Sequence, residues 1–144
     1  SIDTIAGAYD FVVVDNEAGL EHISRRTTRD VDLLLAISDP TVRGLIAAQR
    51  VFELVDELGT RIGQAHLLIN RVPLDEAGEP GLAPGLAAKV EELGLPLLGL
   101  LPQDPLVSDL DASGKPLVDL PQDSPLRRHL LSLIGQALPV AAPI

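Results

Sequence analysis

Four short runs of apolar residues, each ending in a polar or turn residue, organise this chain. They cover residues 11–14, 32–37, 66–69 and 96–101. Each run is shorter than a normal helix and is bounded by residues that favour turns, so we interpret all four as buried β-strands. Continuous apolar runs, as opposed to alternating ones, are typical of parallel strands covered on both faces of a sheet.

Between and after these runs the apolar residues recur every three or four positions, which predicts helices. We expect helices at residues 19–27, 41–58, 84–93 and from Ser124 onward. Asp39 or Thr41 can cap one of them, with Gly59 at its C-terminal end, and Ser124-Pro125 is a typical helix start. Alternating strands and helices predict an α/β fold with a mostly parallel sheet flanked by helices.

The remaining segments are expected to lack regular structure. Residues 72–85 are rich in Pro, Gly and acidic residues and predict an exposed loop, and residues 104–123 predict an extended connection with one helical turn. We therefore assign residues 1–138 to one domain and residues 139–144 to a flexible tail. The leucine-rich face of the last helix favours core packing over membrane targeting.

The charge of the chain restricts its partners. The net charge is −10, which opposes binding to nucleic acid and to anionic membranes, and no apolar run reaches the roughly 20 residues of a membrane span. No basic and then apolar leader is visible at the start, so we expect a cytoplasmic location without stable membrane association. The absence of Cys excludes disulfides and thiolate metal sites within these residues.

The polar residues that end the apolar runs are the candidates for chemistry. Asp15, Asn70 and the run Pro102-Gln103-Asp104 each follow a predicted strand. The carboxyl ends of parallel strands meet at one edge of a sheet, where ligands of open α/β folds bind, so we expect these residues within one nucleotide's reach. Taken singly, Asp15 could instead cap a turn, and Asn70-Arg71 could be a polar turn.

Two stretches resemble a known family. The string Asp-Asn-Glu-Ala-Gly at residues 15–19 resembles the Asp-x-x-Ala-Gly element of MinD-type deviant P-loop ATPases (MinD/ParA-like). Residues 13–27 resemble CooC-type ATPases, which help to insert nickel into carbon monoxide dehydrogenase. The resemblance extends from Tyr9 to about Leu138 and corresponds to the C-terminal part of such a protein. It implies a partial P-loop NTPase fold of the SIMIBI type.

The resemblance also implies a role for individual residues. Asp15 would be the catalytic acid near Mg²⁺, which it holds indirectly, and Gly19 would sense the γ-phosphate through its backbone N–H. The switch segment would comprise Glu21, His22, Arg25 and Arg26. The base pocket would comprise Asn70, Arg71, Pro102 and Asp104. The complete protein would use ATP or ADP with Mg²⁺, and this chain alone is expected to bind neither.

The phosphate-binding loop of such ATPases is missing from these residues. Gly114-Lys115 does not supply it, because Asp109 and Pro116 stand where a glycine and a Ser or Thr are needed. In the family the strand of that loop inserts beside the Asp15 strand, so we expect a gap in the sheet there. Whether the chain acts as an enzyme therefore stays open. The Cys-x-Cys nickel pair of CooC-type proteins is missing as well.

Three functions remain after this reading. The first is the nucleotide-binding portion of an ATPase that assists metal insertion or enzyme maturation, with a second copy and a client metalloenzyme such as carbon monoxide dehydrogenase as partners. The second is a non-catalytic interaction or regulatory module on the same fold. The third, a receiver-like domain phosphorylated at Asp15, lacks the acidic pair and the lysine that such domains need.

Overall fold

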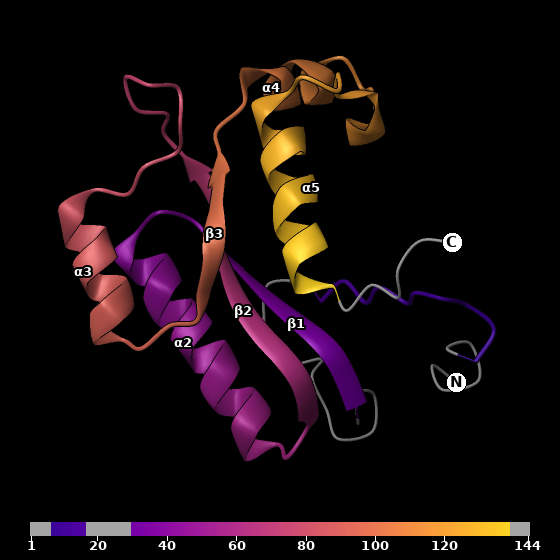
Figure 1. Ribbon diagram of the computed structural model, residues 1–144, viewed down its shortest axis with the longest axis vertical. Coiled ribbons are helices and arrows are strands. Elements are labelled where there is room, and N and C mark those ends of the chain that lie inside the picture. The colour runs from indigo at the N-terminus through magenta and orange to yellow at the C-terminus, as the bar shows by residue number, and fades with distance from the viewer. Residues whose placement is uncertain (1–6, 17–29, 139–144) are drawn as a thin grey trace.

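A three-stranded parallel sheet forms the centre of the computed structural model, which describes residues 7–16 and 30–138 (Figure 1). The strands are β1 (Asp30–Ser38), β2 (Arg61–Val72) and β3 (Leu97–Pro102), in the order β1-β2-β3. Both pairs of neighbours are parallel. The predicted α/β class and the strands at 32–37, 66–69 and 96–101 are confirmed, although β1 and β2 are longer than their apolar runs.

Helices alternate with the strands, and side chains cap the starts of some of them. They are α2 (Val42–Glu57), α3 (Pro84–Glu92), α4 (Pro105–Ala112), α5 (Pro125–Ala137) and the 3₁₀ helix η2 (Leu117–Asp119). Thr41 Oγ1 accepts the N–H of Gly44 at 3.0 Å, and Ser124 Oγ accepts the N–H of Arg127 at 3.2 Å. Each cap satisfies a backbone donor that the first helical turn leaves unpaired. The predictions for these two helix starts are confirmed.

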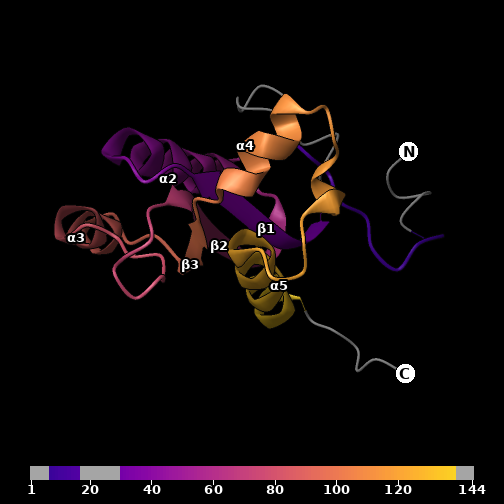
Figure 2. The same cartoon turned by 90° about the horizontal axis from the view of Figure 1, so that it is seen from above.

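Helices cover both faces of the sheet (Figure 2). On one face, Leu45 and Ala48 of α2 and Val90 of α3 pack with Leu67 and Ile69 of β2 in the main buried cluster. On the other face α5 crosses β3, and a Cβ added at Gly99 would lie only 2.4 Å from the side chain of Leu133. A larger residue at this position would force the side chain of Leu133 to shift, so the last helix packs closely against the sheet, as predicted.

The strand predicted at residues 11–14 is wrong. Residues 10–16 contain no strand residue, and Phe11 and Val13 are 64% and 91% exposed. A parallel strand is stable only with a neighbour for its backbone groups and with helices on its faces. In the described part of the chain this segment has no paired strand, so its apolar sequence is not sufficient to form one.

The outer edge of β1 consequently has no paired strand among the described residues. Ile37, at the end of β1, is 56% exposed. The predicted gap lay between the strand of residues 11–14 and β1, and without that strand the sheet simply ends at β1. An open, apolar edge of this kind invites pairing with another strand.

The extended connection predicted at residues 104–123 is also wrong. It contains α4 and η2, and Asp104 caps α4 by accepting the N–H of Leu106 at 3.0 Å. Proline at the first helical position is compatible with a helix, so Pro105 begins α4 instead of preventing it. Residues 73–82 form a loop with one isolated bridge between Leu74 and Pro80.

Two further predicted elements, the helix at 19–27 and the tail at 139–144, lie outside the described residues. Within residues 7–16 and 30–138, no helix combines the length and the hydropathy that a membrane span requires.

Candidate functional site

The carboxyl ends of β2 and β3 meet at one edge of the sheet. Val72 pairs with Pro102, and the N–H of Gln103 donates to the carbonyl of Val72 at 2.9 Å. The structure thus brings together Asn70 and Arg71 from the end of β2 with Pro102 and Asp104 from the end of β3. These four residues are the ones that sequence analysis assigned to a base pocket.

Asn70 and Arg71 form a strained bulge at this edge. The register of β2 with β3 shifts between Ile69 and Val72, and Arg71 has a φ of 58°. A non-glycine residue in this left-handed region costs roughly 1–2 kcal/mol, and such residues cluster at functional sites. The N–H of Arg71 donates to Asn70 Oδ1 at 2.9 Å. This bond fixes the orientation of the side-chain amide of Asn70, whose NH₂ group can donate to a ligand.

Asp104 is buried, and its carboxylate is occupied by the protein. Oδ1 accepts the N–H of Leu106 at 3.0 Å, and Oδ2 accepts the hydroxyl of Ser124 at 2.5 Å and the N–H of Leu126 at 3.5 Å. Burial acts to raise the pKa of Asp104, but these hydrogen bonds outweigh it and the pKa is lowered. The carboxylate therefore fixes α4 and α5, and the backbone at Pro102 and Gln103 is what this loop can offer a ligand.

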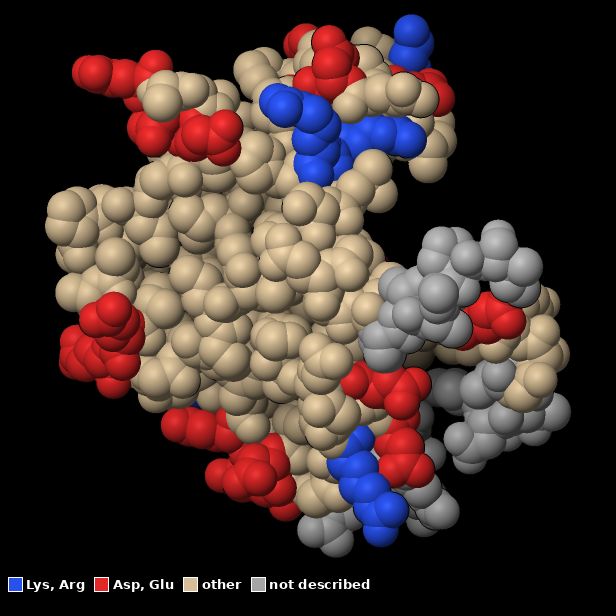
Figure 3. Space-filling model, viewed as in Figure 1, with Lys and Arg blue, Asp and Glu red and all other residues tan. Residues whose placement is uncertain are grey.

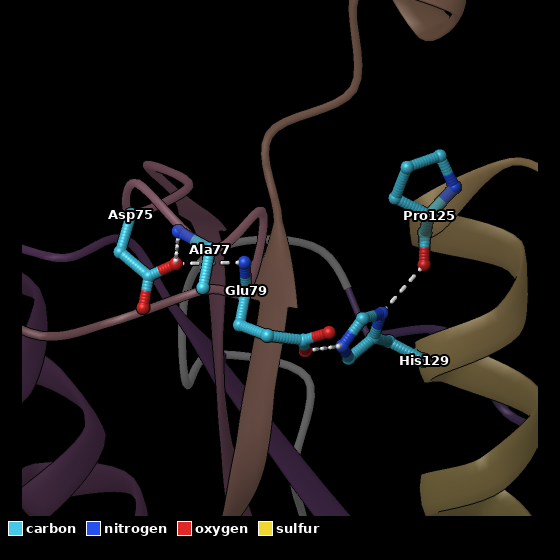
Figure 4. A network of polar contacts seen from close by, with 5 residues as sticks. All are labelled: Asp75, Ala77, Glu79, Pro125 and His129. Atoms are coloured by element: carbon cyan, nitrogen blue, oxygen red, sulfur yellow. Dashed lines mark hydrogen bonds and ion pairs between the residues drawn. The ribbon is translucent and has the colours of Figure 1, made fainter.

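A network of polar contacts ties the loop after β2 to α5 (Figure 4). Asp75 Oδ1 accepts the N–H groups of Ala77 and Glu79, each at 2.9 Å. Glu79 Oε2 lies 3.2 Å from Nε2 of His129, and Nδ1 of His129 lies 2.8 Å from the carbonyl oxygen of Pro125. Sequence analysis missed this contact, because Glu79 and His129 are 50 residues apart and no local pattern relates them.

The charged side chains are unevenly distributed around this edge. Figure 3 shows acidic side chains over the loop that follows β2, and basic side chains near the start of α5. Arg127 Nη1 donates to the carbonyl of Leu120 at 3.3 Å, whereas Arg128 is exposed. Although the chain carries a net charge of −10, the basic side chains of α5 lie near the edge of the sheet where β3 ends.

Asp15 was expected to end a strand at the same edge of the sheet, but no strand carries it there. Asp15 is exposed and belongs to the segment 10–16, which forms no strand. The proposed phosphate sensor and the switch lie outside the described residues: Gly19, Glu21, His22, Arg25 and Arg26. In the part that is described, no group of three His, Cys, Asp or Glu residues could hold a metal ion.

No family model matches the chain. Among curated proteins, it is 39% identical over 123 residues to an uncharacterized ATP-binding protein of Methanocaldococcus jannaschii, and 28% identical over 127 residues to the septum site-determining protein MinD of Helicobacter pylori. The matches cover 85% and 81% of this chain, but only 46% and 45% of those proteins. The chain thus spans less than half the length of these relatives.

Among solved structures, the MinD cell division protein of Aquifex aeolicus matches 99% of this chain and 60% of its own, with a TM-score of 0.72 and 21% identity. The chain has the fold of part of MinD. A second MinD, from Pyrococcus horikoshii OT3 and complexed with Mg-ADP, matches 75% of this chain and 42% of its own, with a TM-score of 0.54 and 22% identity. These likenesses confirm the predicted partial P-loop fold, and the sequence matches confirm the predicted similarity to ATP-binding and MinD proteins.

Proposed function

We propose that this chain is the nucleotide-binding portion of a MinD-type ATPase and holds the adenine base at the carboxyl edge of β2 and β3. The single observation that carries the proposal is the bulge at Asn70 and Arg71. There the N–H of Arg71 bonds to Oδ1 of Asn70 and fixes the side-chain amide at this edge, and the NH₂ group of the amide is a donor that can serve a ligand. The similarity to ATP-binding proteins supports the same assignment.

Each pocket residue then has a chemical role. The NH₂ group of Asn70 donates to a ring nitrogen of the base, and Arg71 covers the base or pairs with a phosphate. The backbone carbonyl groups of Pro102 and Gln103 supply neutral acceptors for the edge of a base, since proline has no N–H and the N–H of Gln103 is bonded to Val72. Asp104 supports this backbone through its hydrogen bonds to Ser124 and Leu106.

The phosphate end of the nucleotide is assigned to residues on the N-terminal side of β1. In this proposal Asp15 acts near Mg²⁺, Gly19 contacts the γ-phosphate, and residues 21–26 form the switch. Mg²⁺ would neutralise phosphate charge during transfer. The glycine-rich phosphate loop would come from outside these 144 residues, and this chain would form the C-terminal part of the complete protein.

The finer role that we propose is assistance in metal insertion or enzyme maturation, as in CooC-type ATPases. Residues 13–27 support it by their resemblance to that group. The partners would be a second copy of the protein and a client metalloenzyme. A neighbouring solved structure, the MinC:MinD complex of Aquifex aeolicus, is an example of an assembly built on this fold.

A second candidate is a non-catalytic interaction module on the same fold. It is favoured by one observation, that no Gly-x-x-x-x-Gly-Lys-Ser/Thr sequence occurs in these residues. A glycine-rich phosphate loop elsewhere in the full-length protein would favour the ATPase over this module.

The test replaces Asn70 with Ala in the full-length protein and measures ATP and GTP affinity. Losing one hydrogen bond to the base should weaken ATP binding by about 1 kcal/mol, roughly fivefold, and reduce the preference for ATP. Gln136→Ala, at an exposed position of α5, is the matched control and should leave both affinities unchanged. Equal ATP affinity in wild type and Asn70→Ala would refute the assignment of Asn70 to the base pocket.

A further inference from the structure

The most exposed apolar side chains gather on one side of the molecule. Among the described residues, large apolar side chains that are more than half exposed occur only in segment 7–16, at the end of β1, in η2 and on α5: Tyr9, Phe11, Val13, Ile37, Leu117, Val118 and Leu131. Figures 1 and 2 both place these four elements on the side of the molecule away from α3. Single exposed apolar residues are normal, whereas a group of them on one side is typical of an interaction surface.

η2 and α5 lie side by side within this group. Arg127 Nη1 donates to the carbonyl of Leu120, directly after η2, at 3.3 Å and so ties η2 to α5. Leu131 comes four residues after Arg127 and therefore lies on the same face of the helix. Val118 of η2 is 79% exposed and Leu131 is 61% exposed. We call Leu117, Val118, Leu131 and Gly135 the η2–α5 surface.

The exposed face of α5 lacks the features of a helix that faces water. After Arg128 the helix contains no Asp, Glu, Lys or Arg. Gly135 follows Leu131 by one turn and is exposed, and a Cβ added there would meet nothing within 4 Å. Glycine destabilises a helix relative to alanine, and no contact with another described residue requires it here. An uncharged face with an open glycine allows another apolar element to approach closely.

We propose that the η2–α5 surface packs against the part of the complete protein that carries the phosphate loop. This inference rests on the proposed function, in which that loop comes from outside these 144 residues. The chain spans less than half the length of its ATP-binding and MinD relatives, so in this proposal a portion of similar length is left to cover this side. A phosphate loop stands between a strand and a helix, and such a helix brings the apolar stripe that an uncharged face accommodates.

A second copy of this chain fits the surface less well. Each copy carries a net charge of −10, so two copies repel one another. The phosphate-loop portion would be joined to this chain covalently, which gives it a high effective concentration at the surface. An apolar surface of this kind therefore favours the intramolecular occupant.

Replacing Gly135 with Leu should have opposite effects in this chain and in the full-length protein. In this chain the new side chain meets open space and improves helix propensity, so the melting temperature should be equal to that of wild type or higher. In the full-length protein it would overfill a packed contact, and the melting temperature should fall by about 3 °C or more.

Gly85→Leu is the matched control for this test. Gly85 is an exposed glycine of α3, and a Cβ added there would also meet nothing within 4 Å. This variant should lower the melting temperature of neither protein. A full-length Gly135→Leu that is at least as stable as the full-length wild type overturns the proposal.

Thiol labelling tests the contact by accessibility, because the chain has no Cys of its own. Val118→Cys, Leu131→Cys and the control Val42→Cys, at a 46% exposed position of α2, are treated with a maleimide without nucleotide, and the labelled peptides are quantified by mass spectrometry. Labelling at 118 and 131 should be at least about tenfold slower in the full-length protein than in this chain, with equal rates at 42.

The remaining outcomes separate this surface from the proposed function. Equal labelling rates at all three positions in a full-length protein that binds ATP overturn the surface alone. Labelling of this chain that slows as its concentration rises assigns the surface to a second copy and also overturns the proposal. A full-length protein that binds no ATP refutes the proposed function and this inference with it.

Discussion

The hydroxyl of Ser124 donates a hydrogen bond to the carboxylate of Asp104, 20 residues earlier in the chain. Both residues are buried, with exposed fractions of 1% and 7%. Asp104 caps α4 and Ser124 caps α5, so a single hydrogen bond links the first turns of two helices to the end of β3. The backbone at Pro102 and Gln103 is held in place by this junction.

Asp104→Ala should destabilise the chain strongly. It removes a helix cap and leaves the buried hydroxyl of Ser124 and the N–H of Leu106 without an acceptor, so we expect a loss of about 2–4 kcal/mol in the free energy of unfolding. Chemical denaturation measures the loss. Asp111→Ala, at an exposed position of the same helix, should change stability by less than about 0.5 kcal/mol. Equal losses of stability in the two variants would contradict the role of Asp104 in linking α4 and α5 to the end of β3.

The contribution of Asp104 should also depend on pH. Its pKa is lowered in the folded state, so the stabilisation is complete above the unfolded value of about 3.9 and is lost as the pH falls through the folded value. The difference in unfolding free energy between wild type and Asp104→Asn should therefore shrink between about pH 5 and pH 2.5. A difference that is constant over this range would show that the folded carboxylate gains nothing from these bonds.

Arg71 should tolerate glycine but reject a β-branched residue. Its φ of 58° is strained for any L side chain and most strained for Val. We expect Arg71→Gly to leave stability within about 0.5 kcal/mol of wild type, because relief of strain offsets the added freedom of the unfolded chain, and Arg71→Val to lose more than about 1 kcal/mol. Thermal unfolding of the two variants decides this. Similar losses of stability in the two variants would contradict the left-handed backbone at Arg71.

The isolated chain should hydrolyse no ATP. The phosphate loop that holds the β- and γ-phosphates is missing from these residues, and Asp15 is exposed in a segment without a strand. A turnover assay with the pure chain, next to Asp15→Asn, measures this. Hydrolysis that Asp15→Asn abolishes would mean that the site is assembled in another way.

The parts of the fold that sequence alone predicts are those that local patterns determine. The apolar runs at 32–37, 66–69 and 96–101 become strands because the sheet gives each of them a neighbour. The run at 11–14 is as apolar, yet it is exposed, because a strand depends on a partner that its own sequence does not encode. Asp104-Pro105 starts a helix by the same pattern as Ser124-Pro125, and the number of prolines obscured it.

The candidate site was predictable to a similar degree. The rule that parallel strands end at one edge correctly placed the ends of β2 and β3 side by side, whereas the base pocket that Asn70 and Asp104 would form stays a prediction. The left-handed backbone of Arg71 and the contact between Glu79 and His129 were not predictable. The former depends on a register shift between two strands, and the latter on residues 50 positions apart.

The location of the base pocket is tested most directly by photolabelling the full-length protein with 8-azido-ATP and mapping the modified peptide. The reactive group is on the base, so the label reports the residues that contact it. We predict labelling within residues 70–73 or 102–104, and protection by excess ATP. ATP-protected labelling confined to other segments would contradict the assignment of the base to the edge of β2 and β3.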